Sequence, residues 1–86
     1  MKDTKYQKFN ISINIGDKPY KVFDLQIQPE DTTDGVPFYI CETNGVEISR
    51  LRKDEKNQWE QIWGDLDTRT INNIGKAIEM HDSSRF

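Results

Sequence analysis

Apolar and polar residues alternate near the start of the chain. Between residues 9 and 15 the apolar positions are Phe9, Ile11, Ile13 and Ile15. A period of two over seven residues predicts a strand with one buried face and one wet face. Residues 16–19 (Gly-Asp-Lys-Pro) then favour a turn.

Residues 20–28 predict a second strand, but its apolar phase changes midway. Tyr20 and Val22 share one phase, whereas Phe23, Leu25 and Ile27 share the other. If Tyr20 lies opposite Ile15 across the turn, Val22 lies opposite Ile13. Leu25 and Ile27 can then lie opposite Ile11 and Phe9 only when the strand holds one extra residue. We therefore predict a β-bulge at Val22–Phe23.

Residues 29–36 form an acidic stretch that predicts a solvated loop. Glu30, Asp31 and Asp34 carry its charge, without the alternating ligands and distal glutamate of a calcium-binding EF-hand loop. We expect no metal site there.

Residues 36–43 and 46–52 predict two further strands joined at Thr43-Asn44-Gly45. A two-residue Asn-Gly turn would pair Cys41 with Ile48. A three-residue turn with a left-handed Gly45 would pair Ile40 with Ile48. We prefer the three-residue turn because it gathers Phe38, Ile40 and Ile48 on one buried face and leaves Tyr39 on the outer face.

Residues 58–63 predict a short fifth strand, at an edge or barely paired. Trp59 and Trp63 share a phase if this segment is extended. Because so polar a chain must find its core among few residues, we expect both tryptophans to close the core beside the helix. The alternative is one exposed tryptophan, which commonly anchors a binding site.

The clearest local pattern predicts a helix that starts at Thr68. Asp67 is a favourable N-cap, and Leu66 and Ile71 have the spacing of a hydrophobic staple. Ile71, Ile74 and Ile78 form one apolar stripe. Gly75 costs helix stability relative to alanine, so we expect a close approach to an aromatic ring such as that of Trp59. The helix should end near residues 80–82.

These elements predict an α+β fold. An antiparallel sheet of four to five strands, built from hairpins, carries one C-terminal helix on one face (β-β-β-β-(β)-α). Residues 1–86 make one small domain, with flexible ends at 1–8 and 82–86. The face under the helix is expected to consist of Phe9, Ile11, Ile13, Ile15, Leu25, Ile27, Phe38, Ile40 and Ile48.

Composition narrows the function classes. The formal net charge is -3 in 86 residues, with acidic and basic residues intermixed, which disfavours a nucleic-acid binder. The single cysteine excludes an internal disulfide, and the polar start lacks a secretory signal, so we expect a cytoplasmic protein without a membrane segment.

Two residues invite a chemical role. His81 is the single histidine, and its position near the helix C-terminus is explained by the helix dipole. Cys41 lies in a predicted strand with Glu42 beside it and Glu47 opposite, which should raise its thiol pKa and leave it inert. We expect no catalytic residue, no metal and no cofactor.

A binding surface is expected instead. The candidate residues combine basic and aromatic side chains around the last two strands: Tyr39, Arg50, Arg52, Lys53, Lys56, Trp59 and Trp63. The small size, the acidic balance and the lack of a recognisable catalytic pattern favour a non-enzymatic module that binds a protein partner or a second copy of itself in a homodimer. One alternative is single-stranded nucleic-acid binding through the open sheet face, a layout that some single-strand-binding domains share. Another is a small acidic inhibitor or immunity-type protein that masks a basic partner.

Overall fold

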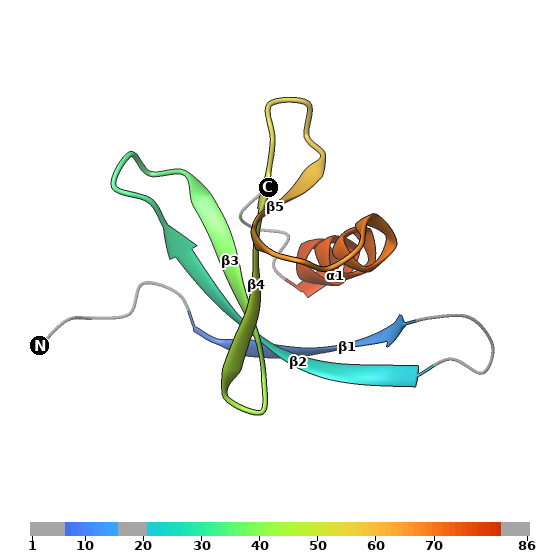
Figure 1. Cartoon of the computed structure of the whole chain (residues 1–86). Helices are drawn as coiled ribbons and strands as arrows, with labels where there is room; N and C mark the ends of the chain where they lie inside the picture. The colour runs from blue at the N-terminus through green and yellow to red at the C-terminus, as the bar shows by residue number, and fades with distance from the viewer. Residues whose placement is uncertain (1–6, 16–20, 82–86) are drawn as a thin grey trace, which may run out of the picture.

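Five antiparallel strands lie side by side in chain order, and one helix follows them (Figure 1). The computed structural model describes residues 7–15 and 21–81. Its elements are β1 (Phe9–Ile15), β2 (Lys21–Asp31), β3 (Pro37–Thr43), β4 (Val46–Lys53), β5 (Trp59–Gly64) and α1 (Thr68–His81). The predicted α+β class is confirmed, with five strands and with β5 at an edge. Most of the predicted flexible ends, residues 1–6 and 82–86, lies outside the described residues.

The sheet twists strongly, as antiparallel sheets do. Figure 1 shows the β1–β2 ribbon and the β3–β5 strands running in different directions, with α1 lying in the angle between them. The helix contacts both edge strands, β1 and β5. We call the helix-covered side of the sheet the inner face and the opposite side the outer face.

β1 and β2 pair without interruption, so the predicted bulge at Val22–Phe23 is wrong. Ile13 lies opposite Phe23, and Asn14 lies opposite Val22. Ile15 pairs with Lys21 rather than with the predicted Tyr20. Tyr20 lies outside the described residues, and β2 needs no extra residue in its pairing with β1. Leu25 and Ile27 face Ile11 and Phe9 as expected.

β2 extends to Asp31, so the first part of the predicted acidic loop is strand. Pro29 is buried inside β2 opposite Tyr39. Because the pairing of β1 with β2 ends at Ile27, the missing N–H of Pro29 costs no hydrogen bond to β1. The remaining turn is held by Thr32, whose N–H donates to Val36 O at 2.9 Å and whose hydroxyl oxygen accepts from Val36 N at 3.0 Å.

The turn between β3 and β4 has two residues, so the predicted three-residue turn is also wrong. Thr43 pairs with Val46, and Asn44 and Gly45 have φ angles of 52° and 77°. Two successive positive φ angles define the type I′ turn that Asn-Gly favours. The left-handed Gly45 is confirmed. The register shifts next to this turn because Ile48 is an extra residue in β4, between Glu47 opposite Glu42 and Ser49 opposite Cys41.

The pairing of β2 with β3 determines which side of β3 is buried. Ile27 on the inner face lies opposite Cys41, so Cys41 and Tyr39 continue that face. Phe38 and Ile40 are half-buried on the outer face, contrary to the expectation that they line the core. Ile48 is partly buried against the core.

The helix forms as its sequence predicts. Thr70 N donates to Asp67 Oδ1 at 3.0 Å, which is the N-cap hydrogen bond. Leu66 packs against the same core cluster as Ile71, in agreement with the predicted staple. The core cluster consists of Ile11, Ile13, Leu25, Ile27, Tyr39, Cys41, Leu51, Ile71, Ile74 and Ile78. The side chain of Ile15, also expected there, lies outside what the structure describes.

Gly75 makes the predicted close approach to Trp59. A Cβ atom at position 75 would lie 2.3 Å from Trp59 Cδ1, a distance that no real side chain tolerates. Helix α1 therefore presses its backbone against the indole of β5. Within the described ranges no helix is long and apolar enough to cross a membrane.

Candidate binding surface around Trp63

The structure divides six of the seven predicted binding residues between the two faces of the sheet and places Lys56 in the turn between β4 and β5. Tyr39 is 1% exposed and lies in the core, so its predicted position on the outer face is wrong. Its ring centroid is 5.7 Å from that of Trp59, at an interplanar angle of 58°. Because Tyr39 lies on the inner face of β3, its side chain cannot belong to a binding surface.

Trp59 joins the helix to the sheet. Its indole N–H donates to Glu79 Oε2 at 2.6 Å. The ammonium of Lys53 is 3.1 Å from the same oxygen and 5.7 Å from the centroid of the indole. The hydrogen bond from Trp59 and then that from Lys53 lower the pKa of Glu79, so this carboxylate stays charged. Trp59 and Lys53 are therefore structural residues at the α1–β5 contact.

The two arginines lie on the outer face, each beside a glutamate. Arg52 Nε is 2.8 Å from Glu60 Oε1. Arg50 binds Glu47 through Nε and also through Nη2, which is 3.3 Å from Glu47 Oε1. The hydrogen bond from Arg50 lowers the pKa of Glu47 and raises that of Arg50. In both ion pairs the glutamate offsets the positive charge that the arginine brings to the candidate surface.

Lys56 lies at the exposed tip of the β4–β5 hairpin. The carboxylate of Asp54 accepts hydrogen bonds from Lys56 N at 2.8 Å and Gln58 N at 2.9 Å, and Asn57 is left-handed with φ 65°. The hairpin tip is thus ordered by Asp54. It holds Lys56 apart from Trp63, at the opposite end of β5.

Trp63 is the exposed aromatic residue of the candidate set. Its side chain is 53% exposed, and its neighbour Ile62 is 42% exposed. Arg50 pairs with Trp63 whereas Leu51 pairs with Gln61, so Ile62 is an extra residue in β5. This bulge moves Trp63 to the outer face, although Trp59 lies on the inner one. The expectation that both tryptophans close the core is wrong, and the alternative of one exposed tryptophan is confirmed.

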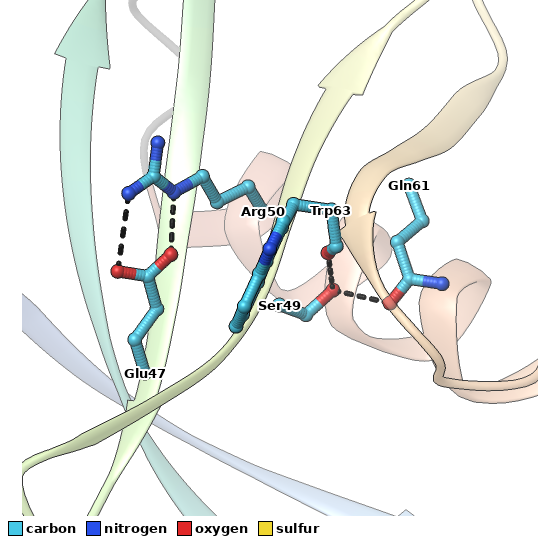
Figure 2. A network of polar contacts seen from close by, with 5 residues as sticks. All are labelled: Glu47, Ser49, Arg50, Gln61 and Trp63. Atoms are coloured by element: carbon cyan, nitrogen blue, oxygen red, sulfur yellow. Dashed lines mark hydrogen bonds and ion pairs between the residues drawn. The ribbon is translucent and has the colours of Figure 1, made fainter.

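A buried polar cluster holds the backbone beneath Trp63. Ser49 is fully buried, and its hydroxyl lies 2.5 Å from Gln61 Oε1 and 3.1 Å from Trp63 O (Figure 2). Gln61 also bonds both backbone groups of Leu66, accepting from its N–H at 3.0 Å and donating to its carbonyl at 3.2 Å. These bonds tie β4, β5 and the connection to α1 together, so Trp63 stands on a rigid support.

A hollow of about 490 Å³ adjoins Trp63. Its lining residues are Glu47, Ile48, Trp63, Gly64 and Asp65. Gly64 has φ 114°, and a Cβ atom there would lie 2.7 Å from the carbonyl oxygen of Ile48. A glycine is therefore required at this point of the lining. We call Ile62, Trp63 and the lining of this hollow the Trp63 patch.

Cys41 and His81 add no reactive group to the Trp63 patch. Burial, with a smaller contribution from Glu47, raises the pKa of Cys41 to about 12, as the sequence predicted. Ser49, not Glu47, lies opposite Cys41. The ring of His81 stacks on Phe9 with centroids 4.0 Å apart. Within residues 7–15 and 21–81 no three His, Cys, Asp or Glu side chains form a metal-binding group.

Sequence reasoning missed most of the Trp63 patch. It identified Trp63 but not Ile62, Glu47 or Asp65, because their proximity depends on the bulges at Ile48 and Ile62. One signal was present in the sequence. Gln61 lies two residues from each tryptophan, so in a regular strand it would share their expected core face, and a buried amide needs hydrogen-bond partners.

Comparison of the chain with protein-family models, with curated proteins and with solved structures finds no match.

Proposed function

We propose that this chain is a non-enzymatic protein-binding module and that the Trp63 patch is its contact surface. The observation that carries the proposal is the exposure of an indole on a rigid edge strand, beside a second exposed apolar side chain. Tryptophan is enriched among the residues that dominate binding energy, since it buries a large area at small entropic cost.

The surroundings of Trp63 suit a contact surface. Polar and charged groups border Trp63, among them the Glu47–Arg50 pair and Asp65. An apolar centre with a polar rim is the usual arrangement of a protein–protein interface. The Ser49–Gln61 cluster holds the backbone of Trp63 in place before a partner arrives, which reduces the entropy cost of binding.

The nucleic-acid alternative has weaker support. A single-strand binder needs basic side chains along a groove and aromatic rings on which bases stack. Arg50, Arg52 and Lys53 each pair with a glutamate, and Tyr39 is buried. Quenching of tryptophan fluorescence by single-stranded oligonucleotides at low salt would favour this alternative instead.

The net charge of -3 agrees with the inhibitor or immunity-type variant of the proposal, in which an acidic module covers a basic partner.

We also propose that the module works in the cytoplasm. The unpaired cysteine, buried in the core, supports a reducing compartment.

Site-specific photo-cross-linking tests the contact surface. The photoreactive residue p-benzoylphenylalanine replaces Ile62 in one variant and Val22 in another, and each is irradiated in an extract of the source cells. Val22 is the matched control because it is exposed on the outer face of β2, away from β5. We expect a discrete cross-linked product from position 62 alone, and its loss when Trp63→Ala is added.

Equal products from both positions, none from position 62, or a product that survives Trp63→Ala would contradict the proposal. The mass of the product also distinguishes the partners. Twice the chain mass identifies a second copy, hence a homodimer, and any other mass identifies a different protein.

A further inference from the structure

The hollow beside Trp63 combines an aromatic face with negative charge. The carboxylates of Glu47 and Asp65 line it together with the indole, and no lysine or arginine among the described residues does so. The nearest outer-face cation is Arg50, the cross-strand neighbour of Trp63, and Glu47 holds its guanidinium. Figure 2 shows Arg50 directed toward Glu47 across β4 from the Ser49 cluster.

Asp65 differs from Glu47 in having no ion-pair partner in the part of the chain that the structure describes. It follows Gly64 directly, at the exposed start of the connection between β5 and α1. The hollow therefore carries one compensated carboxylate, one uncompensated carboxylate and an indole.

The other tryptophan shows what such an arrangement binds. At Trp59 the ammonium of Lys53 lies 5.7 Å from the ring centroid and 3.1 Å from the carboxylate of Glu79. An indole beside a carboxylate attracts a cation through the ring quadrupole and through the carboxylate charge together. At Trp63 the indole and the carboxylates are present, but within residues 7–15 and 21–81 no lysine or arginine lines the hollow.

We propose that the hollow of the Trp63 patch binds a lysine or arginine side chain of the protein partner, with the aliphatic stem on the indole and the charge beside Asp65. The inference rests on the proposed function and specifies the chemistry of its partner. The net charge of -3 supports a basic partner over a second copy of this acidic chain. Long basic side chains suit the hollow because their stems cover apolar surface while their charged ends stay wet.

Nuclear magnetic resonance of the ¹⁵N-labelled full chain tests this inference with four blocked tripeptides, acetyl-Gly-X-Gly-amide, in which X is Arg, Lys, Leu or Glu. The two indole N–H signals serve as reporters, and Trp63→Phe assigns them. We expect the Arg and Lys peptides to shift the Trp63 signal while the Leu and Glu peptides do not. The Trp59 signal should stay in place, since its N–H is bonded to Glu79.

A matched pair of variants isolates the charge. Asp65→Asn should weaken binding of the Arg peptide about two- to five-fold at low salt, with a smaller effect at high salt. Asp34→Asn removes the same charge from the turn between β2 and β3 and should leave binding unchanged.

Three results would overturn the inference: an equal shift with the Leu peptide, equal effects of the two variants, or no shift of Trp63 with any peptide. None of them bears on the cross-linking at position 62, which decides the proposed function separately.

Discussion

The two tryptophans of β5 stand four residues apart and have opposite surroundings. Trp59 lies on the inner face, hydrogen-bonded to Glu79, under the ammonium of Lys53 and against Gly75 of the helix. Trp63 lies on the outer face, half exposed beside an open hollow. In an uninterrupted strand both would share one face, because four is a multiple of the period.

The difference between them comes from one residue. The bulge at Ile62 reverses the phase of β5 between the two indoles, so one strand supplies both a packing residue and a surface residue. A bulge in an edge strand also hinders pairing with another sheet. The contrast teaches that the register of the backbone, rather than residue type, separates the structural tryptophan from the one offered for binding.

The largest expected effect tests the inner face. Ile74→Ala removes a fully buried side chain of α1 and should lower the free energy of unfolding by about 3 kcal/mol. Urea denaturation followed by circular dichroism measures this loss. Ile62→Ala, at the exposed bulge, should cost less than about 1 kcal/mol. Similar losses at both positions would mean that the two faces do not differ as described.

The contact between the helix and Trp59 gives the next effect. Gly75→Ala should destabilise the protein by about 1 to 2 kcal/mol, although alanine is the better helix former, because its methyl group overlaps the indole. The exposed Asn72→Ala in the same helix should be neutral or stabilising. Adding Trp59→Leu should recover part of the loss at Gly75, and independent effects of the two changes would contradict the contact.

The N-cap of α1 should contribute a smaller, pH-dependent effect. Hydrogen bonds from the side chain and then the backbone of Thr70 lower the pKa of Asp67 in the folded protein. Because the folded pKa is the lower one, this stabilisation is present above the unfolded pKa of about 4 and is lost as the pH falls through the folded value.

Asp67→Ala should therefore lower the melting temperature at pH 7, and the difference from the unaltered protein should shrink in acid. Thermal unfolding at a series of pH values measures this. Asp65→Ala, two residues earlier, serves as the control without a cap. A constant difference across the acid range would argue against a capping carboxylate.

The smallest effect on stability is expected at the outer tryptophan. Trp63→Ala should change the free energy of unfolding by no more than about 0.5 kcal/mol, because the side chain contributes surface rather than core. The same urea series measures this value beside that of Ile74→Ala. A large loss at Trp63 would show that it is a packing residue, which would remove the contrast between the two tryptophans.

Sequence reasoning succeeded where the pattern was local and unmixed. Phe9, Ile11 and Ile13 alternate with polar residues, so their face was unambiguous. It failed in β3, where Phe38, Tyr39, Ile40 and Cys41 are all compatible with burial. Periodicity could not choose between the two phases there, and the choice of a three-residue turn selected the wrong one.

The candidate site divides in the same way. Trp63 was found from its residue type. Its exposure, however, follows from a bulge that the sequence of residues 59–63, Trp-Glu-Gln-Ile-Trp, does not reveal. Tyr39 was assigned to the surface because the Asn-Gly turn was given one residue too many. The misplaced bulge at Val22–Phe23 has a related origin, since Ile15 pairs with Lys21 and not with the expected Tyr20.

The sequence by itself determined the order of the elements, the start of α1 at the Asp67 cap and its isoleucine stripe. These features depend on residues a few positions apart and on local hydrogen bonding. Only the tertiary structure decided the phases of β3, β4 and β5. The pairing of Ile27 with Cys41 directs Tyr39 inward, the extra residue Ile48 sets the phase of β4, and the extra residue Ile62 directs Trp63 outward.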